Sequence, residues 1–165
     1  MGTYCANTGH LIREPFGSAR NILKFRANMP IETTKQLNDI IENSMPKKIV
    51  YSRGGAAKKV FQALRIEVNS ELSELDVFLK NAIDLLDNSG RICVISFHSL
   101  EDRIVKTVFK ELATACICPP SFPICVCGHK AEINLISRKP ITASDNELSL
   151  NSRSSCAKLR VAEKI

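Results

Sequence analysis

The stretch GRICVISFHSLEDRIVK, residues 90–106, decides the fold of this chain. Its apolar run from Ile92 to Ile95 is continuous rather than alternating, which is typical of a strand covered on both faces in a parallel α/β sheet. The following residues, Ser96 to Ser99, then lie at the carboxyl end of the strand, where open α/β sheets bind ligands. An acidic turn and an amphipathic pattern come next and predict a helix. Function should therefore be sought at this strand end.

The cluster after the strand admits three functional interpretations and one structural interpretation. A serine hydrolase would need a G-x-S-x-G elbow, and a metal site at His98 would need a second histidine at helical spacing; the sequence offers neither. A cluster that positions a cofactor or substrate fits the place in the fold. As a structural feature, Ser99 and Asp102 form a capping-box pattern, which accounts for both residues without any function. Capping leaves Phe97 and His98 unexplained.

Periodic apolar positions predict the elements on either side of this stretch. Thr33 followed by Gln36 is a capping-box pattern and predicts the start of a short amphipathic helix. A longer apolar pattern over 61–86 predicts either one long helix or two helices in near-register. Gly90 is expected to end this helical segment by adopting the left-handed conformation. The other expected elements are a short basic helix over 19–27, a helix after the strand with residues 104–112 on its inner side, strands around 133–135 and 159–161, and a polar linker over 142–155.

The positive charge of the chain is unevenly distributed. The 165 residues carry a formal net charge of +6, and residues 47–65 contain six cations and no acid. Such runs are found on RNA-binding surfaces and equally on solvated faces, and the charge alone leaves both interpretations open. The cations that we consider for RNA binding are Lys47, Lys48, Arg53, Lys58, Lys59 and Arg65, with Arg153, Lys158 and Arg160 near the end of the chain.

The cysteines form a second unusual feature. Four of the seven lie in the segment CICPPSFPICVCG, as Cys116, Cys118, Cys125 and Cys127. Two close pairs could supply four thiolates to zinc, although the spacing is not that of the common C-x2-C knuckle. A rigid loop with reduced thiols, or a pair of disulfides, explains the same pattern. The sequence alone therefore assigns no metal.

Six motifs in chain order resemble one family. They are PIETT, FQALRIEVNSEL, GRICVISFHSLEDRIVK, CPPSFPICVCG, RKPI and AKLRVAEK. In this order and at these distances they are similar to the C-terminal part of the RsmH or MraW family, the small-subunit ribosomal RNA cytosine-N4 methyltransferases. The resemblance covers residues 30–165 well and the first 29 poorly.

The resemblance implies an α/β fold with two parts. Residues 1–68 would be part of a helical, substrate-binding domain that is inserted into the sheet, and 69–165 the trailing half of a Rossmann-like class I methyltransferase sheet. The family transfers a methyl group from S-adenosylmethionine to the exocyclic amine of a cytidine in ribosomal RNA. Ser96 and His98 would then be catalytic candidates, and Phe97 and Ser99 would border the cofactor.

The sequence departs from the family where the cofactor should bind. The chain has no G-x-G, so the tight turn that approaches the cofactor has no counterpart, and Gly55-Ala56 stands where the family shows His-Pro. Ser155 and Cys156 likewise replace an expected Arg-Ser. We therefore expect a chain that lacks the cofactor-binding half, binds S-adenosylmethionine weakly or not at all and has no turnover alone.

The expected partners and setting follow from the same resemblance. Small-subunit ribosomal RNA is the expected substrate, with a complementing N-terminal half or a second copy of the chain as partner. No run approaches the length of a membrane span and the first residues lack a secretory pattern, so we expect a cytoplasmic protein without a membrane partner. The alternatives are an RNA-binding module without catalysis and a decayed or truncated gene product.

Overall fold

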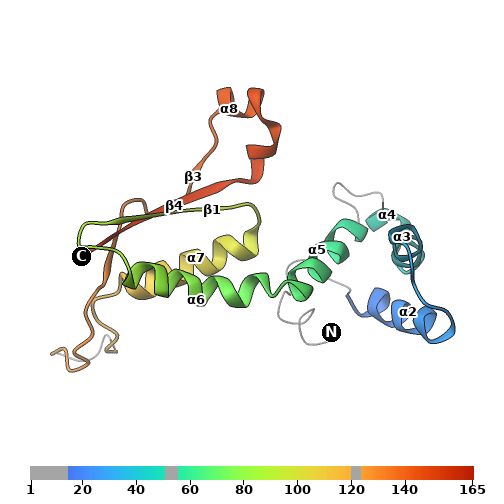
Figure 1. Cartoon of the computed structure of the whole chain (residues 1–165), viewed down its shortest axis with the longest axis horizontal. Coiled ribbons are helices and arrows are strands. Elements are labelled where there is room, and N and C mark those ends of the chain that lie inside the picture. Colours follow the sequence, from blue (N-terminus) through green and yellow to red (C-terminus); the bar gives the residue numbers. More distant parts are fainter. Residues whose placement is uncertain (1–14, 51–55, 120–123) are drawn as a thin grey trace. The chain divides into compact units, whose positions relative to one another are not determined.

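The computed structural model describes residues 15–50, 56–119 and 124–165 of the chain. The chain divides into two compact units, Met1–Glu71 and Leu72–Ile165. The boundary expected from the sequence came three residues earlier, after residue 68. Helices and a sheet are both present, and the predicted α/β class is confirmed (Figure 1). Among the described residues, no helix is both long and apolar enough to cross a membrane.

The first unit is helical. Its core is Ile41 and Val60, against which partly buried apolar residues from the neighbouring helices pack. The predicted capping box is confirmed: the Gln36 N–H donates to Thr33 Oγ1 at 3.2 Å, and the Thr33 N–H donates to Gln36 Oε1 at 3.0 Å. The helices are α2 (Pro15–Asn28), α3 (Thr34–Asn43), α4 (Lys47–Val50) and α5 (Ala56–Val68).

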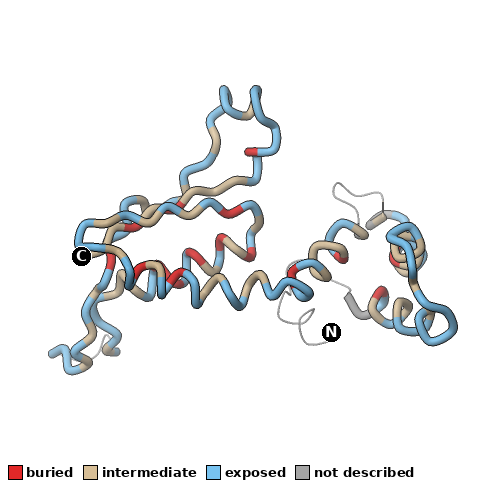
Figure 2. Tube along the Cα trace, viewed as in Figure 1, coloured by how far each residue is buried: buried red, intermediate tan, exposed pale blue. Residues whose placement is uncertain are grey.

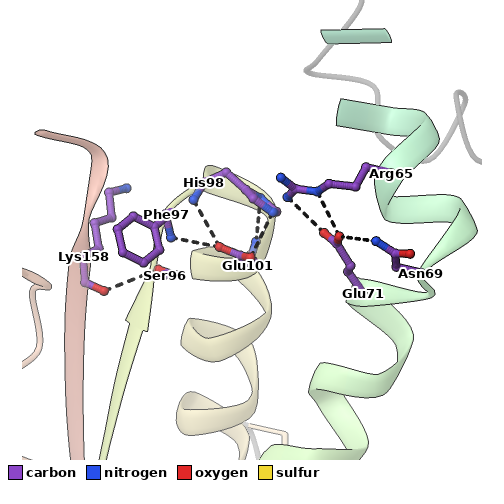
Figure 3. A network of polar contacts seen from close by, with 8 residues as sticks. All are labelled: Arg65, Asn69, Glu71, Ser96, Phe97, His98, Glu101 and Lys158. Atoms are coloured by element: carbon purple, nitrogen blue, oxygen red, sulfur yellow. Dashed lines mark hydrogen bonds and ion pairs between the residues drawn. The ribbon is translucent and has the colours of Figure 1, made fainter. Parts of the chain in front are cut away.

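The apolar pattern over 61–86 forms two helices, which is the second of the two predicted arrangements. A break separates α5 from α6 (Glu71–Asp84), with Ser70 in the left-handed region at φ 53°. Glu71 holds this turn: Arg65 Nε lies 2.9 Å from Glu71 Oε1, and Asn69 Nδ2 donates to the same oxygen at 3.1 Å (Figure 3). A carboxylate in the first turn also suits the dipole of α6.

The second unit combines α6 and α7 (Ser99–Leu112) with a four-stranded sheet. Strand β4 (Lys158–Lys164) is central and pairs antiparallel with each of the other three. The sheet order is β1-β4-β2, with β3 also paired to β4. The other strands are β1 (Arg91–Ser96), β2 (Ile133–Leu135) and β3 (Ile141–Thr142).

The core of the second unit lies where α6 and α7 meet the sheet (Figure 2). Leu79 and Ile83 from α6 are fully buried, together with Val105, Val108, Phe109, Ile133 and Ala162. The helix face predicted for 104–112 is therefore confirmed. Ile92 and Val94 pack against this core, whereas Ile95 is 59% exposed. The expectation that β1 is covered on both faces in a parallel sheet is wrong for the described residues, because the strand alternates and its pairing is antiparallel.

Three local expectations also need correction. The residue in the left-handed conformation after α6 is Ser89, at φ 64°, and not Gly90. Gly90 is required by space instead, since a Cβ atom there would lie 2.7 Å from the Asp87 carbonyl oxygen. The polar linker over 142–155 contains α8 (Asp145–Leu150) and the 3-10 helix η1 (Ser152–Cys156). The alternation of the apolar Leu159 and Val161 predicts β4, but its buried residues are Arg160 and Ala162, on the opposite face of the strand.

Candidate functional site

The link between β1 and α7 is fixed by His98 and Glu101. His98 is the N-cap of α7: its Nδ1 accepts the Glu101 N–H at 3.4 Å, and the Glu101 carboxylate accepts the N–H groups of His98 at 3.2 Å and Phe97 at 2.9 Å (Figure 3). The capping box predicted at Ser99 and Asp102 is therefore displaced by one residue. This arrangement satisfies backbone donors that the start of a helix leaves without partners.

The second nitrogen of His98 has no hydrogen-bond partner among the described residues. Because Nδ1 accepts a hydrogen bond, the proton of a neutral ring resides on Nε2. Nε2 lies 3.1 Å from Glu101 Oε1 but is not aligned to donate to it, and it is buried without a hydrogen-bond partner among the described residues. The side chain as a whole is 13% exposed. A held imidazole with an unused N–H donor can orient an acceptor group, such as a carbonyl oxygen of a base.

The residues on either side of His98 differ in their surroundings. Ser96 is buried, and its hydroxyl donates to the Lys158 carbonyl at 3.4 Å, which ties the end of β1 to β4. Phe97 is 56% exposed, and Ser99 is exposed. The structure thus brings the four predicted residues to one strand end and gives the Ser96 hydroxyl a structural partner. An exposed phenyl ring beside a held imidazole offers a flat surface on which a base could stack.

Asp102 forms an ion-pair cluster that the sequence did not predict. Arg160 Nε lies 2.7 Å from Asp102 Oδ1, its Nη2 lies 3.3 Å from Oδ2, and Lys158 Nζ lies 3.2 Å from Oδ2. Burial raises the pKa of Asp102, but hydrogen bonds and positive charge from Arg160 and Lys158 outweigh it and hold the pKa below its usual value. Arg160 is only 8% exposed, so we remove it from the predicted RNA surface. One sequence feature could have indicated this cluster: Lys158 and Arg160 lie two residues apart on a strand, so their side chains share one face.

Five of the other predicted RNA-binding cations lie on exposed positions. Lys47 of α4 and both Lys58 and Lys59 of α5 are exposed, and α4 packs against α5. Arg65 keeps 57% of its side chain exposed while it pairs with Glu71. In the second unit, Arg153 is exposed and Lys158 is half-buried. The Lys48 side chain and the whole of Arg53 lie outside the described residues.

An open groove of about 440 Å³ lies between α2 and α3. Four amide side chains line it together with one cation, one acid and two apolar residues. These are Asn21, Asn28, Gln36 and Asn43, with Lys24, Asp39, Phe25 and Ile40. No motif in the sequence predicts this groove, because its lining residues come from two separate helices.

The four clustered cysteines converge in space. The Sγ atoms of Cys116, Cys118, Cys125 and Cys127 all lie within 4.8 Å of one another, and all four thiols are free. Backbone hydrogen bonds from Ile117 and His129 lower the pKa of Cys127 to about 6. For Cys116, a backbone hydrogen bond from Cys118 is outweighed by hydrogen bonds with the other thiols, which raise its pKa to about 12. Four thiols that converge in this way form a donor set for a soft cation.

Known proteins have sequences similar to this chain. A sequence model described as the MraW methylase family matches residues 13–165. A ribosomal RNA small subunit methyltransferase H of Finegoldia magna is 53% identical over 148 residues, which is 89% of this chain and 47% of the relative. The protein of that name from Caldicellulosiruptor saccharolyticus is 54% identical over 147 residues, with the same coverage. A ribosomal RNA small subunit methyltransferase H 2 of Agathobacter rectalis is 47% identical over 99% of this chain and 54% of the relative.

These matches agree with the six motifs read from the sequence, and the family predicted there is confirmed. The chain spans about half the length of the curated relatives it matches. The family model extends over most of both structural units. The chain therefore belongs to the MraW methylase family.

Proposed function

We propose that this chain is the C-terminal portion of an enzyme that transfers a methyl group from S-adenosylmethionine to the N4 amine of a cytidine in small-subunit ribosomal RNA. The observation that carries the proposal is the family match over residues 13–165. The chain would contribute the strand-end residues and an RNA-binding surface, and a complementing N-terminal half would contribute the main cofactor contacts. The proposed substrate places this enzyme in the cytoplasm.

The geometry at the end of β1 supports a role in presenting the target base. Methylation of an exocyclic amine requires an unstacked base, with its nitrogen aimed at the methyl group and a polar group to receive the proton that leaves. Phe97 offers an exposed ring for stacking, and His98 Nε2 is a nitrogen without a hydrogen-bond partner in the described structure. We therefore keep Phe97 and Ser99 as residues that border the cofactor and base, and His98 as the catalytic candidate. Ser96 supports the strand end through its bond to Lys158.

S-adenosylmethionine, where the full site is assembled, supplies the activated methyl group. In this chain, the residues at the end of β1 would orient the acceptor amine, and the proton that it releases would pass to water. The sequence contains no G-x-G turn of the kind that brings backbone close to a cofactor. The proposal therefore assigns to this chain the acceptor side of the site and not the cofactor side.

The test is reconstitution of methyl transfer. The purified chain is mixed with the soluble N-terminal half of one of the matched relatives and with small ribosomal subunits that lack the modification. Transfer of labelled methyl groups is followed, and the modified nucleoside is identified by mass spectrometry after nuclease digestion. We expect N4-methylcytidine from the mixture and none from the chain alone. A folded, associated pair of halves that methylates nothing would contradict the proposal.

A second candidate function is RNA binding without catalysis. The exposed lysines of α4 and α5 favour it, because a surface of cations neutralises phosphates whether or not a reaction follows. Reconstitution separates the two functions, and a calorimetric titration of the folded chain with S-adenosylmethionine measures how much of the cofactor site this chain carries. Clear binding would show that this chain carries more of the cofactor site than we propose.

A further inference from the structure

We propose that Cys116, Cys118, Cys125 and Cys127 bind one zinc ion, which closes the segment between α7 and β2. Four sulfur ligands at about 2.3 Å from a tetrahedral zinc ion lie about 3.8 Å from one another. In this chain Cys116 Sγ lies 3.5 Å from Cys125 Sγ and 3.8 Å from Cys127 Sγ, and Cys125 and Cys127 are 3.5 Å apart. These three sulfurs already stand at the separations that one ion requires, and Cys118 Sγ lies within 4.8 Å of each of them.

The same distances argue against disulfides. A disulfide holds its sulfurs about 2.05 Å apart and joins each sulfur to one partner. Here each of Cys116, Cys125 and Cys127 has its sulfur near two others, and all three are free thiols. Sulfurs grouped around a common point are the arrangement of ligands around an ion. A spread of at most 4.8 Å among the four suits one ion rather than a larger cluster of several metals.

The donor set and its surroundings select zinc. Four cysteine thiolates are a standard ligand set of structural zinc, and a site with all four positions filled by protein leaves none open for catalysis. The Val126 N–H points to Cys118 Sγ at 3.4 Å. Such N–H groups stabilise the negative charge of a thiolate and orient it toward the metal. Zinc also accepts tetrahedral geometry without any electronic penalty.

The segment between α7 and β2, which holds the four cysteines, has in its described part few other contacts that could stabilise it. The hydrogen bond from the Glu132 N–H to the Leu112 carbonyl, at 2.8 Å, closes its base. Between these residues, the described parts contain no helix or strand, and Figure 1 shows the segment extending away from the sheet of its unit. Ile117, Ile124 and Val126 are 65%, 74% and 73% exposed, so the described part of the segment has no apolar core. Long connections without a core are uncommon in compact domains. A zinc ion would cross-link the two halves of the segment at a point far from the hydrogen bond between Glu132 and Leu112.

The experiment measures the metal directly. The full chain is purified under reducing conditions and its metals are quantified by plasma mass spectrometry. We expect about one zinc ion per chain. Cobalt exchanged into the same site should give the intense visible bands of tetrahedral thiolate coordination. Cys118→Ser and Cys127→Ser should lose most of the zinc, whereas Cys93→Ser and Cys156→Ser, which change exposed cysteines outside the cluster, should retain it.

Three outcomes would overturn the proposal. The first is a reduced, folded chain that takes up no zinc even when zinc is supplied. The second is iron in place of zinc in the purified chain. The third is a pair of disulfides among these cysteines in material whose free thiols were blocked at lysis. If the serine variants do not fold, proteolysis of the unmodified chain decides: a chelator should expose residues 113–131 to cleavage, and equal resistance with and without chelator would count against zinc.

Discussion

Arg160 of β4 binds Asp102 of α7 through two hydrogen bonds, with Nε 2.7 Å from Oδ1 and Nη2 3.3 Å from Oδ2. Both side chains are nearly buried, with 9% and 12% of their surface exposed. Lys158 adds a third contact to the same carboxylate at 3.2 Å. The central strand and the helix that follows the candidate site are thus connected by one carboxylate.

Replacement of this carboxylate should destabilise the second unit. Asp102→Asn leaves the buried guanidinium of Arg160 without a counter-charge, and removal of one partner of a buried pair costs about 3–5 kcal/mol. Urea denaturation measures the loss in the free energy of unfolding. Asp76→Asn is the matched control, because Asp76 pairs with Lys80 on the exposed surface of α6. We expect less than about 1 kcal/mol there, and equal losses in the two variants would contradict a special role for Asp102.

The same carboxylate should make stability depend on acid pH. The pKa of Asp102 is lower in the folded chain than its ordinary value. The contribution of Asp102 to the free energy of unfolding is therefore complete above the unfolded-state pKa and is lost as the pH falls through the folded-state pKa. We expect the stability gap between the unmodified chain and Asp102→Asn to be constant at neutral pH and to shrink below about pH 4. Denaturation curves across this range measure it. A gap that stays constant down to the acid limit would rule out the linkage.

His98 has two roles that one substitution can separate. Asparagine is among the best N-cap residues, so His98→Asn should keep the helix start and change the free energy of unfolding by less than about 0.5 kcal/mol, whereas His98→Ala should lose about 1 kcal/mol. In the reconstituted enzyme, both variants should lower methyl transfer, because both remove the imidazole. The measurements are urea denaturation and turnover. A His98→Asn variant with full turnover would reduce His98 to a structural cap.

The lysines of α5 should carry part of the RNA affinity. Lys58→Ala with Lys59→Ala should weaken binding to small-subunit ribosomal RNA, and each lost phosphate contact should reduce the slope of log K against log salt by about 0.7–0.9. Both side chains are exposed, so folding should be unchanged. Filter binding over a salt series gives the slope.

A matched substitution on another helix provides the control for this prediction. Lys35→Ala removes an exposed lysine from α3 of the same unit. We expect it to have a smaller effect than the α5 pair. Identical slopes for the unmodified chain, the α5 pair and Lys35→Ala would remove these lysines from the RNA surface.

Features that depend on a few neighbouring residues were predictable from the sequence. The start of α3 is one case, because Thr33 and Gln36 lie within one turn and need no other part of the chain. The helix after β1 was also predicted, but its cap was placed at Ser99. Serine is a commoner N-cap than histidine, and both pairs have the same spacing. The structure uses His98 because β1 continues to Ser96, which pairs with Lys158 and leaves only two residues before the helix.

Features that depend on distant partners were not predictable. The sequence marks β1 as apolar but does not say which element covers each face, and Ile95 remains exposed. The burial of Arg160 depends on Asp102, which is 58 residues away. Because a charged residue is rarely buried without a partner, the sequence pattern put the apolar positions of β4 inside. The convergence of the four cysteines was likewise not predictable, because two C-x-C pairs do not specify how the chain between them turns.

The central position of β4 bears on how the chain folds as it is made. Synthesis from the N-terminus produces β1, β2 and β3 before the only strand with which the described structure pairs them. The contact between Arg91 and Glu163 spans 72 residues, and contacts of such separation slow folding. On the ribosome, α6, β1 and α7 would therefore emerge with an incomplete sheet, open to chaperones. A shortening of the chain by a few residues within β4 would deprive every strand of its partner at once.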